Sequence, residues 1–333
     1  MRALWALAFA FGCSTSPCDD DHTCIDSATD AAPSDVGADT EARVRDAAAD
    51  ASDSGASIDA TLVDAGPDTS DATAPDAGPL PGFTVVTWNI ENFPQATSTP
   101  RLVAEIIESE RWDLIGVQEI SDDAAFLALI DELEDYDGYV SFDDRAFQRN
   151  GILFRRDRVR VRNVQRLFER DGYAFPRDPL AADVTFLNED GSVAFDFAFV
   201  VVHLKATLEE ESRLRRLDAI EKLDAWARQV MADGENEVVI VGDYNDEASD
   251  PAGENVFGPM LGDGYSILTQ ALDEDAFSFI PFRALIDHVV ITSETIQEYG
   301  MGTISIAENV RTGVLNYTDN VSDHLPVVAR FVP

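Results

Sequence analysis

Short apolar runs and stretches of helical periodicity alternate from Phe83 to the end of the chain. Apolar, β-branched runs predict strands, and apolar residues at every third or fourth position predict amphipathic helices. We expect strands at 83–89, 114–119, 151–154, 159–167, 182–187, 194–204, 238–243, 285–292 and 325–331. We expect helices at 101–109, 123–133 and 208–231. The segment 188–191 (Asn-Glu-Asp-Gly) predicts a hairpin turn. Helices interspersed with hairpins favour an α/β domain with mixed sheets over an all-parallel, doubly wound sheet.

This pattern is missing from most of the head of the chain. Residues 26–81 consist almost entirely of Asp, Ala, Ser, Thr, Gly and Pro and contain no aromatic residue. Such a segment cannot bury enough apolar surface to offset its chain entropy. We therefore expect residues 13–81 to form a disordered, acidic tether and residues 82–333 to form one domain. The formal net charge of the chain is −39, and both parts are acidic.

The first 12 residues have the features of an export signal. A positive Arg2 precedes a nine-residue apolar stretch, 3–11, which is too short to span a bilayer as a helix. Because Gly12-Cys13 follows, the segment resembles a bacterial lipoprotein signal, in which cleavage precedes an acylated Cys. This predicts a signal peptide at 1–12 and an exported protein, lipid-anchored to the cell envelope through Cys13 or secreted. The alternative is an ordinary secretory signal with an incidental Cys.

Cysteine usage agrees with export, since all three cysteines, Cys13, Cys18 and Cys24, lie in the head. Cys18 and Cys24 either close a small loop in an oxidising compartment or remain free. No disulfide is available to the domain, so packing must stabilise it.

Polar residues suited to phosphate or metal chemistry lie at or near the ends of the predicted strands, where side chains from different strands converge on one site. They form six motifs: 87–92 (Thr-Trp-Asn-Ile-Glu-Asn), 117–119 (Val-Gln-Glu), 202–205 (Val-His-Leu-Lys), 241–246 (Val-Gly-Asp-Tyr-Asn-Asp), 286–288 (Ile-Asp-His) and 322–326 (Ser-Asp-His-Leu-Pro). In this order and spacing they resemble the endonuclease/exonuclease/phosphatase superfamily, over about residues 83–332. The resemblance implies a four-layer α/β/β/α sandwich, with two facing mixed sheets flanked by helices and the active site at one edge.

The resemblance also implies a divalent metal site built from hard oxygen ligands. Glu119 is the principal metal ligand, and Asn89 helps to place the metal or the phosphate. Asp243 orients or deprotonates the attacking water, Asn245 donates to the phosphate, and Asp323 is an accessory ligand. Metal contacts are thus expected from Asn89, Glu119, Asp243, Asn245 and Asp323. Mg²⁺, or Mn²⁺ or Ca²⁺, suits such donors.

Acid-base and phosphate-binding roles follow from the same resemblance. His203 contacts the phosphate or acts as an acid or base, and Asp287 holds His324 in one tautomer so that it stabilises or protonates groups near the scissile phosphate. Arg177 matches an arginine of secreted deoxyribonucleases that reaches a phosphate. The alternative for Arg177 is a loop-surface arginine.

Three further residues and one cluster are ambiguous in the sequence. Glu91 is either a second carboxylate of the site or a solvated loop residue, and we favour the latter. Lys205 is either a cation at the site or a strand-end surface lysine, and His288 is expected to be structural because it points away from Asp287. The arginines between 145 and 166 form either a nucleic-acid track or a solvated strand face.

These residues predict a metal-dependent phosphoester hydrolase that uses in-line water attack. The interpretation that we favour is a cell-surface or secreted nuclease. Two motifs, 202–205 and 322–326, resemble those of secreted bacterial nucleases, although an acidic domain lacks the basic footprint of a tight DNA binder. The first alternative is a phosphodiesterase or phosphatase acting on small-molecule or lipid-headgroup phosphoesters. The second is an inactive binding protein, which the intact motif set disfavours. We expect a monomer.

Overall fold

The computed structural model describes residues 82–142, 145–262 and 264–332. The expected signal peptide at 1–12 and tether at 13–81, including Cys13, lie outside these residues. Among the described helices, none combines the length and the apolar character needed to cross a bilayer.

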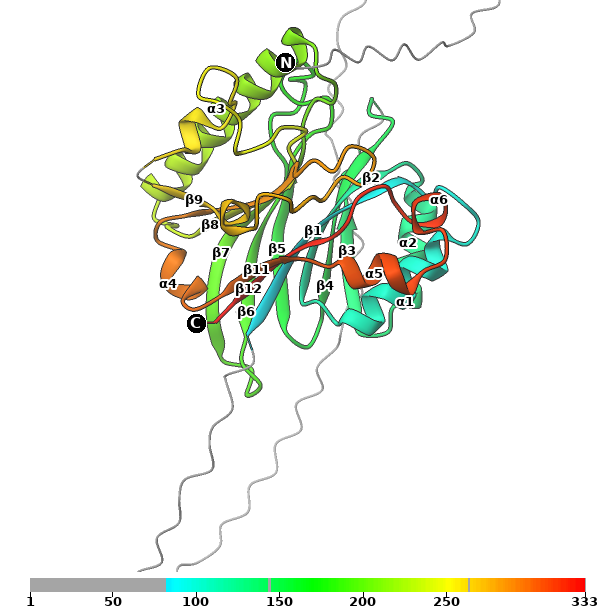
Figure 1. Ribbon diagram of the computed structural model, residues 1–333. Helices are drawn as coiled ribbons and strands as arrows, with labels where there is room; N and C mark the ends of the chain where they lie inside the picture. Colours follow the sequence, from blue (N-terminus) through cyan, green and yellow to red (C-terminus); the bar gives the residue numbers. More distant parts are fainter. Residues whose placement is uncertain (1–81, 143–144, 263, 333) are drawn as a thin grey trace, which may run out of the picture. The chain divides into compact units, whose positions relative to one another are not determined.

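Two six-stranded mixed sheets form the centre of the domain (Figure 1). The first sheet has the order β11 (Thr303–Ile306), β12 (Val327–Phe331), β1 (Phe83–Phe93), β2 (Leu114–Ile120), β4 (Arg149–Arg155), β3 (Tyr136–Val140). The second has the order β5 (Val159–Arg166), β6 (Leu180–Leu187), β7 (Val193–His203), β8 (Val238–Asp243), β10 (Asp287–Thr292), β9 (Tyr265–Ile267). The pairs β1/β2 and β7/β8 are parallel and the other pairs are antiparallel.

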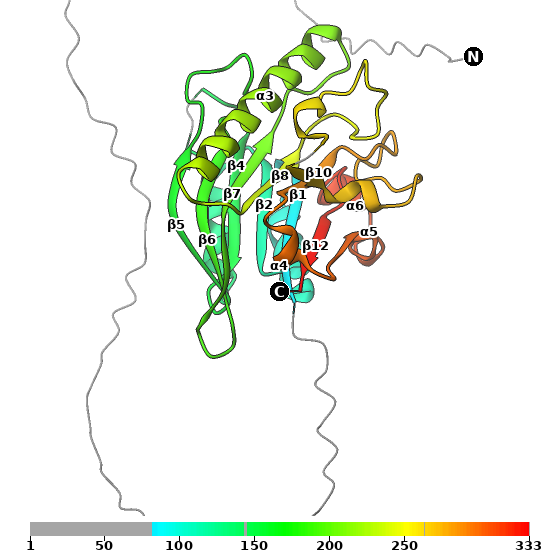
Figure 2. The same ribbon diagram turned by 90° about the vertical axis from the view of Figure 1, so that its left-hand side faces the viewer.

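Helices cover the outer faces of the two sheets. On the first sheet lie α1 (Thr99–Glu110) and α2 (Asp123–Glu132), and on the second lies α3 (Glu210–Ala232), which Figure 2 shows in the foreground. The short helices α4 (Ile296–Tyr299), α5 (Glu308–Gly313) and α6 (Tyr317–Asn320) complete the chain around β11 and β12. The expected four-layer α/β/β/α sandwich is confirmed.

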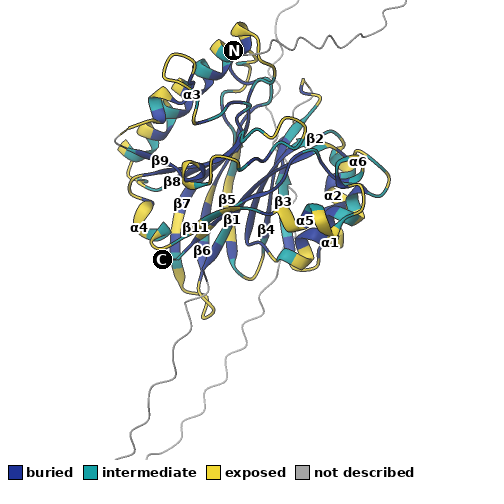
Figure 3. Cartoon of the chain, viewed as in Figure 1, coloured by how far each residue is buried: buried dark blue, intermediate teal, exposed yellow. Residues whose placement is uncertain are grey.

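Three apolar layers hold the sandwich together, because each sheet buries both of its faces. Ile107 and Phe126 pack on the first sheet from outside, and Ile220 and Leu223 pack on the second. The layer between the sheets consists mainly of β-branched and Phe side chains contributed by both. Figure 3 shows the buried strands at the centre and the exposed residues on the outer surfaces of the helices.

The two sheets approach closely at Gly116 in β2. A Cβ at this position would lie 2.6 Å from Cγ2 of Val241 and 2.9 Å from Cγ2 of Val201. Both valines belong to the central strands of the second sheet, β8 and β7. The absence of a side chain at Gly116 therefore lets the parallel pair of one sheet lie against the parallel pair of the other.

Strand register brings the expected site residues to one edge. Asn89 is paired with Gln118, the neighbour of Glu119, across the parallel strands β1 and β2. His203 is paired with Asp243 across β7 and β8, and Asp243 is paired in turn with Asp287 across β8 and β10. Each sheet thus delivers the carboxyl ends of its parallel strands to the same region.

Candidate active site

Asn89 connects the two sheets at this edge. Its Nδ2 donates to Oε1 of Glu119 at 3.2 Å and to Oδ2 of Asp243 at 3.0 Å. Asn89 and Asp243 are buried, while Glu119 is half-buried. Glu119 has a left-handed backbone, with φ of 66°, which is uncommon for a residue with a Cβ and is typical of functional sites. The predicted principal carboxylate and the predicted water-orienting carboxylate are therefore joined by one amide group.

His203 lies between the same two carboxylates. Its Nε2 is 3.5 Å from Oδ2 of Asp243 and 3.8 Å from Oε1 of Glu119. Burial, reinforced by the charges of Arg177 and His324, lowers the pKa of His203 well below its usual value, so the ring is neutral. Its Nδ1 is buried and has no hydrogen-bond partner among the described residues.

His324 and Asp287 form a buried ion pair. The His324 Nδ1 is 2.7 Å from Oδ2 of Asp287, and its Nε2 is 3.8 Å from Oδ2 of Asp243. Burial alone would lower the pKa of His324, but the carboxylates of Asp287, Asp243 and Asp323 outweigh it and raise the pKa to about 10. The ring is therefore protonated at neutral pH and directs its Nε2 proton toward the site.

The backbone around His324 is also fixed. Its N–H donates to Oγ of Ser322 at 2.9 Å, and its carbonyl accepts from the hydroxyl of Tyr317 at 2.8 Å. The ring of Phe279 covers that of His324, with 4.8 Å between their centroids. A ring that is bonded to Asp287, covered by Phe279 and carried on a fixed backbone keeps its orientation without help from a substrate.

Asp243 has an unusual titration for a carboxylate. Burial and the charge of Asp287 raise its pKa to about 7, although His324 and the hydrogen bonds from Asn89 and Asn245 oppose this rise. The Asn245 N–H donates to Oδ1 of Asp243 at 2.9 Å. A carboxylate with a pKa near neutrality can both accept and release a proton at physiological pH.

Glu91 differs from our expectation, because it is part of the site rather than a solvated loop residue. It accepts through Oε2 from the backbone N–H of Asp323 at 2.8 Å, and its own N–H donates to Oδ1 of Asn89 at 3.0 Å. Burial, followed by the charge of Asp323, raises the pKa of Glu91 to about 7. Burial likewise raises the pKa of Asp323. Glu91 and Asp323 therefore form a second pair of carboxylates beside Asn89.

Arg177 lies at the same edge, between β5 and β6. Its Nη1 donates to the carbonyl of Leu204 at 3.4 Å, and its Nη2 donates to Oε1 of Gln148. Burial lowers its pKa, while the carboxylates of Glu119 and Asp243 oppose this effect. The Asn245 Nδ2 also donates to the Leu204 carbonyl, at 3.3 Å. All eight predicted catalytic residues are thus brought together, and Asp323 with them.

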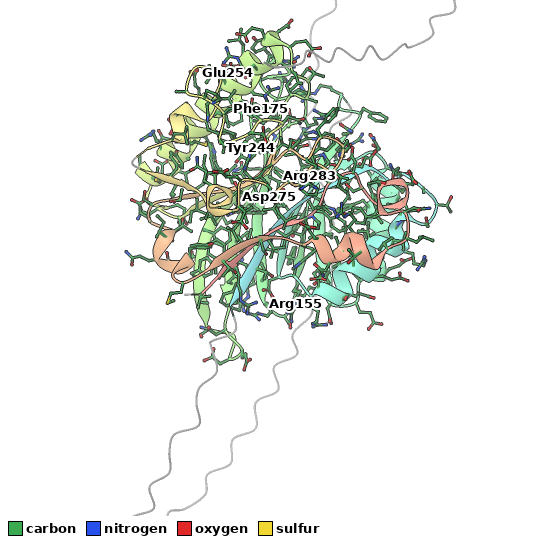
Figure 4. The ribbon with its side chains drawn as sticks, in the orientation of Figure 1. Arg155, Phe175, Tyr244, Glu254, Asp275 and Arg283 are labelled. Carbon is green, nitrogen blue, oxygen red and sulfur yellow. The ribbon has the colours of Figure 1, made fainter. Side chains whose placement is uncertain are left out.

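Two other features of the sequence have structural explanations. The ring of His288 is buried and bonds to Oγ1 of Thr269 at 2.6 Å and to the carbonyl of Asp246 at 3.0 Å, which agrees with the structural role expected for it. Among the clustered arginines, Arg155 and Arg158 pair with Asp113. Figure 4 shows Arg155 at the opposite end of the sheets from Tyr244, the residue that follows Asp243.

The donor set fits a hard divalent cation. Five carboxylates gather at this edge: Glu91, Glu119, Asp243, Asp287 and Asp323. Such crowding raises pKa values and is relieved by a bound cation. Ligand atoms of Asp243, Asp287 and His324 lie within 4.8 Å of one another, but His324 already uses Nδ1 to bond Asp287. The carboxylate and amide oxygens around Asn89 are therefore the better ligands.

Fold and site together define the chain as a phosphoesterase. A model of the Endonuclease/Exonuclease/phosphatase family matches residues 86–324, and the chain therefore belongs to that family. No curated protein matches the chain by sequence.

Solved structures of low identity share the fold. Truncated TDP2 from Caenorhabditis elegans is 18% identical with a TM-score of 0.57, and the match covers 76% of this chain and 98% of that one. The human nocturnin catalytic domain with bound sulfate is 17% identical with a TM-score of 0.54, over 76% and 94% of the two chains. The mannosyl-6-phosphatase of Bacteroides thetaiotaomicron is 15% identical with a TM-score of 0.53, over 75% and 100%.

Proposed function

We propose that this protein is a divalent-metal-dependent phosphodiesterase that cleaves nucleic acid by in-line attack of water. The observation that carries the proposal is the junction of the two sheets at Asn89, where Glu119, Asp243 and His203 meet beside a protonated His324. Phosphoester hydrolysis requires a base, an acid or donor, and positive charge near the phosphate. This edge supplies all three.

Glu119 would be the principal metal ligand, and Asn89, Asp243, Asn245 and Asp323 would complete the set. Glu91, which bonds the Asp323 N–H, extends it. When bound, Mg²⁺, or Mn²⁺ or Ca²⁺, supplies positive charge to the phosphate oxygens and lowers the repulsion among the carboxylates.

The chain's own residues supply the proton chemistry and the orientation. Asp243 accepts a proton from the attacking water through a carboxylate that hydrogen bonds from Asn89 and Asn245 hold in position. His324 presents a positive Nε2–H to the phosphate and keeps it there through Asp287. Neutral His203 donates a hydrogen bond to the phosphate, and the planar guanidinium of Arg177 presents N–H donors to it. Asn245, anchored on Leu204, contributes a further donor.

Two observations bear on the substrate. The TDP2 of D. rerio, which is 17% identical, has been solved in complex with a single-stranded DNA product, and this supports a nucleic-acid substrate. The strongly acidic composition and the mannosyl-6-phosphatase relative support the second candidate, a phosphodiesterase or phosphatase acting on small molecules or lipid headgroups.

The test compares plasmid DNA with bis-para-nitrophenyl phosphate across Mg²⁺, Mn²⁺ and Ca²⁺. A nuclease nicks the plasmid, a small-molecule phosphodiesterase hydrolyses only the synthetic diester, and a binding protein hydrolyses neither. Asp243→Asn should abolish whichever activity the wild type shows. Activity that survives both chelation and Asp243→Asn would contradict the proposal.

We also propose that the protein acts as a monomer outside the cytoplasm, held to the envelope by an acyl group on Cys13. The apolar stretch at 3–11, followed by Gly12-Cys13 and an acidic spacer, supports this localisation. Cys13→Ala should move the protein from the membrane fraction to the soluble fraction or the medium. Unchanged partitioning would argue against acylation.

A further inference from the structure

Three basic side chains beside the site form no ion pair among the residues that the structure describes. Arg177, Lys205 and Arg215 donate to backbone carbonyls or to Gln148, and within the described part of the chain none of them forms an ion pair with a carboxylate. By contrast, Arg213 and Arg216 on the same stretch of α3 pair with Glu210 and Asp246. In a protein of net charge −39, unpaired cations gathered at one place are unusual.

Side chains of α3 bond the neighbouring loop and hold these cations in place. Arg215 donates from Nε to the carbonyl of Tyr173 at 2.7 Å and from Nη2 to that of Gly172 at 2.9 Å. Its guanidinium also lies over the Tyr173 ring, 5.4 Å from the centroid. Nearby, Nζ of Lys222 bonds Asp171 at 2.5 Å and ties the same loop to α3. The loop that carries Arg177 is therefore fixed to the helix.

Lys205 is fixed from the same helix and lies next to the catalytic groups. Arg216 donates to its carbonyl at 2.9 Å, and the Lys205 Nζ donates to the carbonyl of Ala206 at 3.0 Å. The preceding residue, Leu204, accepts from both Arg177 and Asn245. Burial and the charges of Arg215 and Arg177 lower the pKa of Lys205, which places the three cations within electrostatic reach of one another.

Glu119 and Asp243 act on Arg177, and Glu209 acts on Lys205, only through their charges, because no ion pair joins them among the described residues. Donors of these cations are therefore open to an anionic ligand. The anion cannot be the scissile phosphate alone, because Glu119, Asp243 and His203 already define that position. Lys205 and Arg215 lie beyond it, on the side of the loop at 172–177 and the start of α3. Both are half-buried, so each retains donors that a ligand can reach.

We propose that Lys205 and Arg215 bind a second phosphate of the substrate, adjacent to the cleaved phosphate that Arg177 contacts. The inference rests on the proposed phosphodiesterase function and deepens it, because it restricts the substrate to molecules with two neighbouring phosphates. A strand of nucleic acid supplies such a group as an internal diester, and a small phosphorylated molecule supplies it as a terminal monoester.

Exposed arginines at the other end of the second sheet provide a control. Arg160 lies on the outer strand β5, where it is paired with Thr185, which is paired in turn with Asp196. Asp196 lies toward the end of β7 opposite His203. Arg160 is exposed, like Arg162 two positions on, so it tests whether any exposed positive charge on the surface would serve equally well.

The experiment measures kcat/KM on four thymidine substrates at several salt concentrations. The reference is a dinucleotide with a single phosphodiester. The others carry an additional 5′-phosphate, an additional 3′-phosphate, or a third nucleotide that makes the second phosphate a diester. Wild type is compared with Lys205→Gln, Lys205→Arg, Arg215→Gln and Arg160→Gln, each checked for wild-type thermal unfolding.

We expect wild type to prefer at least one two-phosphate substrate to the reference. Lys205→Gln and Arg215→Gln should each reduce that preference by about tenfold, the effect of removing one charge-assisted hydrogen bond. The losses should be largest at low salt and smaller at high salt, because screening weakens the attraction between these cations and the phosphate. Lys205→Arg should restore most of the preference, and Arg160→Gln should leave all four rates unchanged. Preference among the three two-phosphate substrates identifies whether a diester or a monoester is bound.

Equal losses on the reference and on every two-phosphate substrate would overturn the inference and leave the proposed function intact. The same conclusion would follow if Arg160→Gln reduced the preference as much as Lys205→Gln. A wild-type protein that hydrolyses no phosphoester with any metal would overturn the proposed function, and the second-phosphate site with it.

Discussion

Replacement of Asp287 by Asn removes one negative charge and leaves the shape of the site unchanged. Asp287 is fully buried, and its Oδ2 accepts from Nδ1 of His324 at 2.7 Å. An Asn at this position still accepts from Nδ1–H through its carbonyl oxygen, so the tautomer and the orientation of the ring are retained. Only the charge that stabilises the protonated ring is lost.

The size of the effect follows from the pKa of His324. A pKa of about 10, against the ordinary 6.5, corresponds to about 5 kcal/mol of preference for the protonated ring, at about 1.36 kcal/mol per pKa unit. Asp287 supplies the largest favourable part, and Asp243 and Asp323 supply the rest. Loss of one adjacent opposite charge lowers a pKa by about 1 to 3 units. We therefore expect His324 to titrate near pH 8 in the variant.

The assay is the pH dependence of kcat on a soluble phosphodiester between pH 6 and pH 10.5. Wild type should keep its activity up to about pH 10, because the raised pKa keeps His324 protonated. Asp287→Asn should lose its activity about two pH units earlier, so that at pH 9 it falls about tenfold further below wild type than at pH 7. His288→Gln is the control, because that ring contacts Thr269 and Asp246 instead. An unshifted alkaline limb in Asp287→Asn, or a shifted one in His288→Gln, would refute the reasoning.

Three further predictions test the site and the stability of the domain. Glu119→Gln should reduce turnover by about a hundredfold or more and raise the metal concentration needed for half activity, whereas His324→Ala should reduce turnover with little change in that concentration, as measured by metal titrations. His288 has a folded pKa of about 4 because it is buried, so its contribution to stability is complete above about pH 6.5 and is lost as the pH falls toward 4. The free energy of unfolding, measured with urea, should therefore fall between pH 7 and pH 4.5 by about 2 to 3 kcal/mol less in His288→Gln than in wild type. An equal fall in both proteins would contradict this role of His288. A protein that begins at Pro81 should unfold cooperatively and keep its hydrolytic activity, because the buried apolar residues of all three layers lie between Phe83 and Phe331; loss of cooperative calorimetric unfolding would show that residues before Pro81 are needed.

The apolar pattern of the sequence predicted the central strands, because these strands are long and continuously apolar, whereas the sandwich followed from the resemblance of the six motifs to a known superfamily. It did not reveal β3, β9 or β11, which are short edge strands with mixed polarity. Edge strands bury one face or less, so their pattern is weak, and their pairing depends on a neighbour that is distant in sequence.

The residues of the candidate site likewise divide into those that the sequence predicted and one, Glu91, that it did not favour. Six motifs at strand ends predicted Asn89, Glu119 and their partners, since register carries strand ends to one edge. Glu91 was not favoured, because its role depends on the backbone N–H of Asp323, far away in the sequence. The left-handed backbone at Glu91, with φ of 35°, also breaks the strand periodicity on which an estimate of its direction depends.

The close approach of the sheets at Gly116 has a consequence for how the enzyme would lose activity. Asn89 and Glu119 belong to β1 and β2 and His324 to the segment before β12, whereas His203, Asp243 and Asp287 belong to β7, β8 and β10. The distances between these groups therefore depend on how far apart the two sheets lie and on how they are displaced along each other. No covalent crosslink joins the two sheets in the described domain. A small displacement between layers, such as a methyl group at Gly116 would impose, should separate Asn89 from Asp243 while both sheets stay folded. Heat, pressure or cosolvents should accordingly abolish hydrolysis under milder conditions than those at which circular dichroism detects a loss of strands.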